Sequence, residues 1–172
     1  MPVTILGDLG GDGLRVAVLV ARWNTDITDR LRDGALGALA RMRVRPGDVT
    51  VVEVPGAFEL PAAAAAAART RRFDAIVALG CVLKGETDHD RHIACACAHG
   101  LVDVSVETGV PVGFGVITAD TLAQAKARSD ERRGAGGKGG HKGIEAAEAA
   151  VRLANAIRGL GRRGRPRPRA RS

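Results

Sequence analysis

The stretch GCVLKGETDHDRH, residues 80–92, gathers acid, hydroxyl and imidazole side chains directly after an apolar run. Its composition predicts that a helix begins near His89, whose imidazole can transfer protons close to neutral pH. Gly85 permits close approach to the backbone, and the unpaired amides of a helix N-terminus bind phosphate or carboxylate groups. We expect Thr87 to be the N-cap, with Asp90 three residues later completing the cap. The stretch therefore predicts an anion site beside a proton-transfer histidine, although a solvated surface histidine is the alternative for His89.

Possible metal ligands occur in the same region, namely His89, His92, Cys95, Cys97 and His99. On a helix His89 and His92 share a face, but Cys95 and Cys97 are two residues apart and point in opposite directions. The CxxC and HExxH spacings of common metal sites do not occur here. We therefore expect no metal ion, and we treat His92 as a surface or secondary residue.

The elements that position these candidate site residues can be predicted from the alternation of apolar runs and helical patterns along the chain. Runs rich in β-branched residues predict strands covered on both faces at residues 14–21, 48–54, 73–83 and 110–117. Helical composition or spacing predicts helices at residues 26–42, 62–69, 89–109, 121–129 and 142–157. Because crossovers between parallel strands are right-handed, this order predicts an α/β three-layer sandwich around a four-stranded parallel sheet.

Ligands of open α/β sheets bind beyond the carboxyl ends of the strands. The segments expected there are ARWNTDIT, VPGAFELP, GCVLKGETDHDRH and GFGVITAD. They contain three of the chain's four aromatic residues, namely Trp23, Phe58 and Phe114. Each ring alone is most simply a core residue, but three rings at one edge of a sheet favour stacking on a flat ligand.

Length and composition fit a single globular domain, with 172 residues of which 45% are hydrophobic and 26% charged. No run approaches the roughly 20 apolar residues of a membrane span, and the first residues lack the pattern of a secretion signal. Three cysteines suggest reduced thiols rather than a disulfide framework. We therefore expect a cytoplasmic protein without membrane association, with a flexible N-terminal arm at residues 1–13 and a domain at residues 14–160.

The formal net charge of +7 comes mainly from the C-terminal segment GRRGRPRPRARS, residues 161–172, which holds six arginines. The remainder of the chain is close to neutral. Alternating proline and arginine cannot form a packed element, so we predict a disordered basic tail. We expect this tail to be solubilising or incidental, with contacts to RNA, another polyanion or a membrane surface as the alternative.

Several motifs together resemble the lumazine synthase family over about residues 14–158. They are VPGAFELP, DAIVALGCVLKGETDH and GGKGGHKGIEAA in this order, with ARWN near the start. The resemblance implies a flavodoxin-like fold and the condensation of 5-amino-6-ribitylaminouracil with 3,4-dihydroxy-2-butanone 4-phosphate, without cofactor or metal. It also implies a homo-oligomer with the pentamer as its minimum unit. DERRGA, residues 130–135, looks like an insertion near contacts between pentamers, which leaves a pentamer, a decamer and a sixty-subunit shell open.

The resemblance assigns roles to individual residues. His89 matches the proton-transfer histidine, and the phosphate-binding positions are Gly85, Glu86, Thr87 and Arg128. The positions that hold the remaining parts of the substrates are Trp23, Asn24, Ala57, Phe58, Glu59, Cys81, Val82, Leu83, Phe114 and Lys142. Of all these residues, the adjacent subunit is expected to contribute Phe114, Arg128 and Lys142. Three arginines lie near the predicted phosphate-binding position, namely Arg128, Arg132 and Arg133. If the insertion DERRGA is left out, ARS continues directly into GGKGGHKG, and Arg128 then occupies the family's position.

A function from another class is also compatible with these patterns. The chain could be a non-catalytic flavin-binding or phosphate-binding protein on the same fold, with the basic tail as a tether. The presence of His89 beside the expected phosphate loop favours the enzyme.

Overall fold

The computed structural model describes residues 2–130 and 140–163. Its strands are β1 (Val16–Ala21), β2 (Val49–Val54), β3 (Ala75–Leu83) and β4 (Val112–Ala119). Its helices are α1 (Thr25–Arg41), α2 (Leu60–Arg69), α3 (His89–Thr108), α4 (Leu122–Arg128) and α5 (Lys142–Arg163), with short 3-10 helices η1 (Pro46–Asp48) and η2 (Ala57–Glu59). Every predicted strand and helix is present, and each strand boundary lies within two residues of its predicted place.

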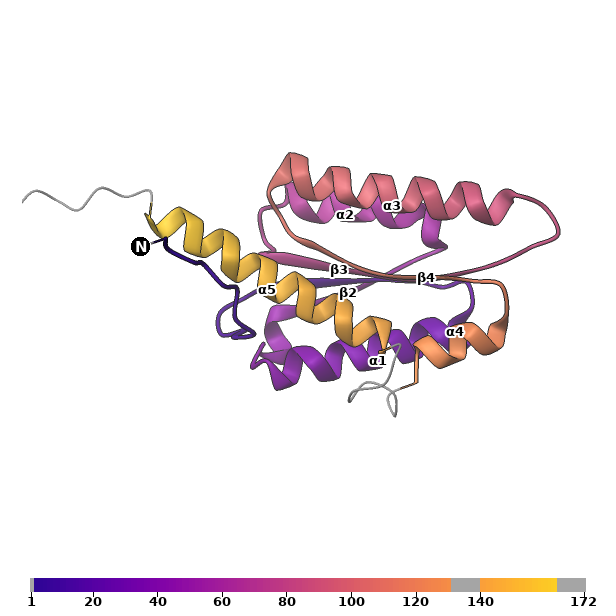
Figure 1. The fold of residues 1–172 in the computed structure, drawn as a ribbon, viewed down its shortest axis with the longest axis horizontal. Coiled ribbons are helices and arrows are strands. Elements are labelled where there is room, and N and C mark those ends of the chain that lie inside the picture. Colours follow the sequence, from indigo (N-terminus) through magenta and orange to yellow (C-terminus); the bar gives the residue numbers. More distant parts are fainter. Residues whose placement is uncertain (1, 131–139, 164–172) are drawn as a thin grey trace, which may run out of the picture.

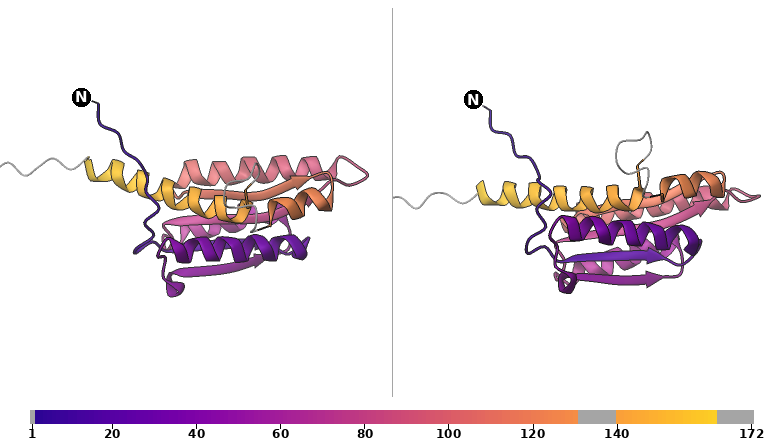
Figure 2. Two further views of the ribbon diagram at one scale, coloured as in Figure 1. Left: turned by 60° about the horizontal axis from the view of Figure 1, so that its bottom comes forward. Right: turned by 90° about the horizontal axis from the view of Figure 1, so that it is seen from below.

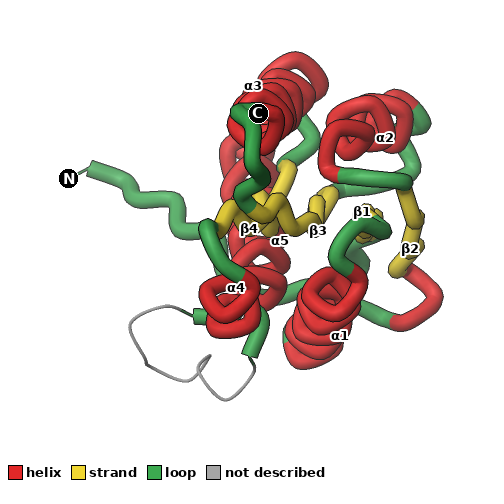
Figure 3. Tube along the Cα trace, turned by 90° about the vertical axis from the view of Figure 1, so that its right-hand side faces the viewer, coloured by secondary structure: helices red, strands yellow, loops and turns green. Residues whose placement is uncertain are grey.

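The strands form one parallel sheet in the order β2-β1-β3-β4. Helices α2 and α3 cover one face, and α1, α4 and α5 cover the other (Figure 1). The end-on view shows the sheet between these two helical layers (Figure 3). Alternate residues of each strand pack into the two cores, so that Leu19 and Ile76 face α2 and α3 while Val18 and Val77 face α1 and α5. The predicted α/β three-layer sandwich is confirmed.

Burial differs between the strands. Every residue of β1 is buried, and in β3 only the last residue, Leu83, is partly exposed, as predicted for strands covered on both faces. In β2 the four residues from Thr50 to Glu53 are exposed, including Val51 and Val52. The prediction of double coverage is therefore wrong for β2 in the single chain, because β2 lies at the edge of the sheet and the helices pack mainly on β1, β3 and β4.

The N-terminal segment contacts α5 beyond the sheet. Helix α5 continues through Arg163, into the first residues of the predicted tail, and residues 164–172 lie outside the described residues. Figure 2 shows α5 projecting past the sheet with the N-terminal segment beside it. Asn155 of α5 donates hydrogen bonds to the carbonyl oxygens of Asp8 (3.1 Å) and Gly10 (2.8 Å), so this part of the predicted arm contacts α5. Among the described helices, none combines the length and apolar character of a bilayer-spanning helix.

Close packing between α1 and α5 fixes the start of α5. A Cβ on Gly143 would lie 2.1 Å from the carbonyl oxygen of Leu31, and a Cβ on Gly34 would lie 2.2 Å from Cε1 of the buried His141. Only glycine admits such approaches. The Nδ1 atom of His141 accepts a hydrogen bond from the Ile144 amide at 3.3 Å, in the first turn of α5. Lys142 is therefore held at a rigid helix start. Of the predicted insertion, residues 131–135 lie outside the described residues.

Candidate active site

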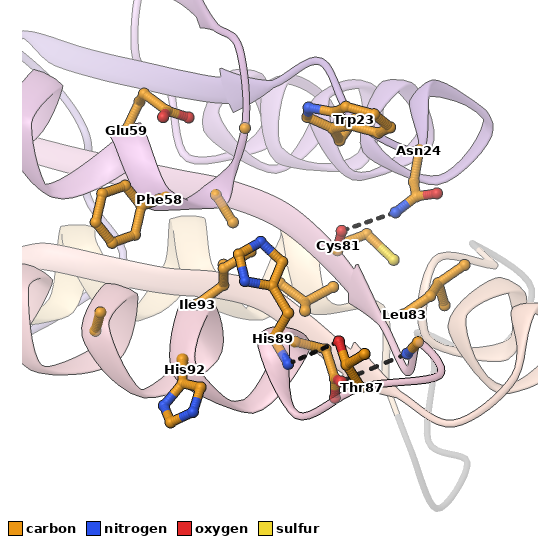
Figure 4. Close-up of a pocket in the computed structure, with 16 residues that line it drawn as sticks. Trp23, Asn24, Phe58, Glu59, Cys81, Leu83, Thr87, His89, His92 and Ile93 are labelled. Atoms are coloured by element: carbon orange, nitrogen blue, oxygen red, sulfur yellow. Dashed lines mark hydrogen bonds between the residues drawn. The ribbon is translucent and has the colours of Figure 1, made fainter.

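The carboxyl ends of three strands meet at a pocket of about 890 Å³. Trp23 follows β1, η2 follows β2, and Cys81 lies near the end of β3. The first two turns of α3, beginning with His89, form the facing wall (Figure 4). Pockets of this size hold small organic molecules. The position agrees with the general rule that ligands of open α/β sheets bind at the carboxyl ends of the strands.

Two aromatic rings in this pocket are largely uncovered. Trp23 is 73% exposed and Phe58 is 61% exposed, although large aromatic side chains are usually buried. Gly56 lies against the indole, since a Cβ on this residue would be 3.0 Å from Cδ1 of Trp23. The exposed ring faces offer apolar surfaces on which a flat ligand can stack.

A side-chain hydrogen bond joins the ends of β1 and β3. Asn24 adopts a left-handed backbone conformation (φ 60°, ψ 51°), and its Nδ2 atom donates to the carbonyl oxygen of Cys81 at 2.9 Å. The Cys81 side chain is buried, and burial raises the pKa of its thiol to about 11. The thiol is therefore protonated at neutral pH and is a poor nucleophile.

The loop between β3 and α3 differs from its prediction at the helix cap. Helix α3 begins at His89 with Asp88 as the N-cap residue, so the prediction of Thr87 as N-cap is wrong. Because Thr87 lies one residue before the cap, its hydroxyl accepts only a long hydrogen bond of 3.5 Å from the His89 amide. Asp90 does turn back to the loop, where its carboxylate accepts a hydrogen bond from the Gly85 amide at 3.4 Å.

The two histidines at the start of α3 differ in direction. Figure 4 shows the His89 ring turned toward Cys81 across the pocket, whereas the His92 ring points away from His89. Further along the helix Cys95 is exposed and Cys97 is buried in the core, as the helical spacing predicts. Within residues 2–130 and 140–163, no three His, Cys, Asp or Glu side chains gather as metal ligands would.

The sequence is similar to that of known proteins over most of its length. A family model described as 6,7-dimethyl-8-ribityllumazine synthase matches residues 13–158. The chain belongs to this family. A 6,7-dimethyl-8-ribityllumazine synthase from Desulfotalea psychrophila is 43% identical over 160 residues, which are 93% of this chain and 99% of that relative. The resemblance to lumazine synthases that the motifs indicated is confirmed.

Most residues predicted from the lumazine synthase resemblance lie together in the structure. Eleven of them line the pocket, namely Trp23, Asn24, Ala57, Phe58, Glu59, Cys81, Val82, Leu83, Gly85, Thr87 and His89. Glu86 belongs to the same loop, but it is exposed and does not line the pocket. The roles assigned to all these residues remain predictions.

Three other predicted residues lie away from this chain's pocket. Phe114 is on β4, the edge strand opposite β2, and its ring is 48% exposed. Arg128 is the exposed last residue of α4. Lys142 is the first residue of α5, where its ammonium group pairs with the carboxylate of Glu145. The fold of one chain therefore does not bring these three side chains into the pocket.

The pocket also contains residues that the sequence did not single out as site residues. They are Gly56, Asp90, His92, Ile93 and Ala96. Ile93 and Ala96 follow His89 by four and seven residues, so helical periodicity places them on the same face and was the signal that could have found them. The contact of Gly56 with Trp23 depends on tertiary packing, so no local sequence pattern predicts it.

Proposed function

We propose that the chain is a lumazine synthase, which condenses 5-amino-6-ribitylaminouracil with 3,4-dihydroxy-2-butanone 4-phosphate to 6,7-dimethyl-8-ribityllumazine, phosphate and water. The observation that carries the proposal is the single pocket that unites an exposed indole, a carboxylate and a first-turn histidine, supplied by Trp23, Glu59 and His89. Membership of the family and 43% identity to a relative of that name support the same reaction. The enzyme is then a transferase of riboflavin biosynthesis.

The pyrimidine substrate is proposed to bind at the β1 side of the pocket. The exposed face of Trp23 stacks on the heterocycle, with Asn24 beside it. Backbone groups of residues 81–83 then hydrogen-bond to the edge of the ring. Ala57 and Phe58 of η2 flank the ribityl chain, whose hydroxyls donate to the Glu59 carboxylate.

The phosphate of the second substrate is proposed to bind at residues 85–87, before the first turn of α3. Backbone amides at a helix N-terminus carry partial positive charge and suit an anion. The side chain of Glu86 is exposed and outside the pocket, so its charge is directed away from the phosphate while its amide stays available. This position leaves the butanone carbonyl next to the pyrimidine.

The chemistry then requires little more than proton transfer in a shared pocket. The 5-amino group attacks the ketone, and loss of water gives an imine. A proton leaves the adjacent carbon, phosphate departs, and the ribityl-bearing nitrogen closes the ring with loss of a second water. His89, with its ring in the pocket, shuttles these protons. No cofactor or metal is needed, because holding two substrates together itself lowers the barrier by several kcal/mol.

The assembly is proposed to be a homo-oligomer with a pentamer as its minimum unit, in which neighbours complete each pocket. Phe114 of β4, Arg128 of α4 and Lys142 of α5 do not line the pocket of their own chain. Light scattering measures the assembly, and a stable active monomer contradicts the proposal. Mixing His89→Ala with Arg128→Ala subunits tests the sharing, because shared pockets regain an intact His89 and Arg128 pair. Activity no greater than the sum of the two variants excludes shared pockets.

We also propose a cytoplasmic location. Cys81, Cys95 and Cys97 are all free thiols, which is usual in a reducing compartment.

The reaction is tested by mixing the purified chain with both substrates and recording lumazine fluorescence. Product formation well above the uncatalysed rate supports the enzyme. Binding of a ligand without such formation supports the binding-protein alternative instead. In His89→Ala we expect kcat to fall by about 100-fold without complete loss, since the orientation of the substrates is kept.

A further inference from the structure

Asp90 occupies a place in the pocket that the proposed mechanism leaves unused. It is the second residue of α3, lines the pocket, and is partly buried. Its Oδ1 atom accepts the hydrogen bond of 3.4 Å from the Gly85 amide, drawn as a dashed line beside Thr87 in Figure 4. Gly85 is one of the predicted phosphate-binding positions, so one amide of the proposed phosphate loop already has an acidic acceptor within the chain.

The charge of this carboxylate is not neutralised by a neighbouring base. Asp88, two residues earlier, approaches Arg91 at 4.0 Å, but in the described part of the chain no lysine or arginine forms an ion pair with Asp90. Asp90 thus presents a negative charge at the point where a phosphate would approach the loop.

A phosphate and this carboxylate cannot occupy the Gly85 amide together. One N–H group makes one well-directed hydrogen bond, so a phosphate oxygen must displace Oδ1 of Asp90 to reach it. After displacement the two anions still lie close together and repel each other. Both effects weaken phosphate binding relative to the same loop with a neutral residue at position 90.

We propose that Asp90 is a specificity-determining residue that competes with phosphate for the Gly85 amide and so sets the affinity for the phosphorylated substrate and for the phosphate released. The inference rests on the proposed function for the identity of that substrate. A weakened anion site has a physical consequence for turnover, because the phosphate product leaves more easily. In this proposal the hydrogen bond from Gly85 to Asp90 breaks when phosphate binds and forms again when phosphate leaves.

The alternative is that Asp90 only holds the loop in shape for the anion. The two roles separate because asparagine keeps a side-chain oxygen that can accept from the Gly85 amide but carries no charge. Asp90→Asn therefore preserves this hydrogen bond and removes only the charge repulsion against the phosphate. Asp90→Ala removes both and provides a second variant with high helix propensity. Asp88→Asn is the matched control, since it removes one negative charge from the same loop at a residue that does not line the pocket.

The experiment titrates the full-length chain and these variants with inorganic phosphate by calorimetry, and measures steady-state lumazine formation separately. For Asp90→Asn we expect the phosphate Kd to fall by about three- to tenfold, which corresponds to removal of one unfavourable charge interaction. The KM for butanone phosphate falls in the same ratio, while the KM for the pyrimidine stays within about twofold of the unmodified value. Asp90→Ala behaves alike, and Asp88→Asn changes the phosphate Kd by less than about twofold.

Three results overturn the inference. Folded Asp90→Asn that binds phosphate with unchanged or lower affinity shows that the residue fastens the loop. An equal gain in Asp88→Asn shows a general charge effect, and no phosphate binding by any form excludes the anion site itself. The proposed function fails independently of this: an unmodified chain that makes no lumazine, while Asp90→Asn still gains phosphate affinity, refutes the reaction and keeps the role of Asp90.

Discussion

The side-chain amide of Asn24 donates a 2.9 Å hydrogen bond to the backbone carbonyl oxygen of Cys81. Asn24 stands between β1 and α1, and Cys81 lies near the end of β3, so this bond ties together two walls of the pocket. The backbone of Asn24 is left-handed, a conformation that asparagine tolerates better than most residues. Asn24 thus forms the turn after β1 with its backbone and fixes that turn to β3 with its side chain. The same turn places the neighbouring Trp23 in the pocket.

We expect Asn24→Gly and Asn24→Ala to differ in stability for this reason. Both lose the hydrogen bond, worth about 1 kcal/mol. Only Asn24→Ala also places a Cβ-bearing residue without a stabilising side-chain contact in the left-handed region, at a further cost of about 1 kcal/mol. Urea unfolding at one fixed protein concentration measures the two free energies of unfolding. Equal stability of the two variants contradicts the argument from backbone conformation.

Stacking of Trp23 on the heterocycle can be followed directly, because it is the chain's single tryptophan. We expect riboflavin or a product analogue to quench its emission. In Gly56→Ala the new Cβ would lie 3.0 Å from Cδ1 of Trp23 and 3.1 Å from Oε2 of Glu59, so both side chains must shift. We expect the KM for the pyrimidine to rise by about tenfold in this variant, since misplacement of binding groups is costly.

The matched control for that variant is Gly47→Ala, because a Cβ on Gly47 meets no atom within 4 Å. Its kinetics and emission should stay at the unmodified values. Emission that does not change at saturating ligand, after inner-filter correction, counts against stacking. A normal pyrimidine KM in Gly56→Ala shows that the indole position is unimportant.

The sequence predicted the scaffold well because its signals are local. The apolar runs that became β1 and β3 are buried along nearly their whole length, and the strand ends placed Trp23, Phe58 and His89 in one pocket. The cap of α3 was predicted one residue too early, because Thr87 and Asp88 are both good N-cap residues and only the path of the loop selects between them.

Other features could not be predicted from local pattern. The exposure of Val51 and Val52 depends on strand order and on where the helices pack, because β2 lies at an edge of the sheet that the helices cover little. The contact of Gly56 with Trp23 depends on how two strand ends are brought together. Whether Phe114 contacts a ligand in another copy of the chain depends on assembly and not on the fold of one chain.

Asp74 provides a prediction about acid stability at the other end of the sheet. Its carboxylate accepts hydrogen bonds from the Arg15 amide at 2.9 Å and the Arg15 side chain at 3.2 Å, and it pairs with Arg158 at 2.9 Å. Burial alone would raise the pKa of Asp74, but these contacts outweigh burial and hold the pKa below its ordinary value of 3.8. The group therefore links β1, β3 and α5 in its charged form.

Because the pKa of Asp74 is lower in the folded than in the unfolded chain, its contribution is present above the unfolded pKa and is lost as pH falls through the folded pKa. We expect Asp74→Asn to lower the free energy of unfolding by about 1–2 kcal/mol at pH 7. The difference from the unmodified chain should shrink below about pH 4. Urea unfolding at pH 7, 5 and 3 checks this, and a difference that stays constant across that range contradicts the linkage.

Arg128 is the arginine proposed to bind the substrate phosphate in a neighbouring pocket. It ends α4, whose N-cap Thr121 accepts a hydrogen bond from the Gln124 amide at 3.2 Å, so its backbone is fixed by a capped helix. A planar guanidinium binds phosphate best when it is aimed by a rigid backbone. The alternatives, Arg132 and Arg133, lie outside the described residues.

We therefore expect Arg128→Ala to raise the KM for butanone phosphate by about tenfold or more, the loss that accompanies removal of a charge-assisted hydrogen bond. The KM for the pyrimidine should stay within about twofold, because Arg128 is assigned to the phosphate alone. Arg132→Ala and Arg133→Ala serve as controls of equal charge and should match the unmodified chain in both constants. If Arg128 is merely a solvated residue at the end of α4, all three variants will give the same KM for butanone phosphate. A phosphate-specific defect in Arg132→Ala or Arg133→Ala, with Arg128→Ala normal, would transfer the role to the insertion.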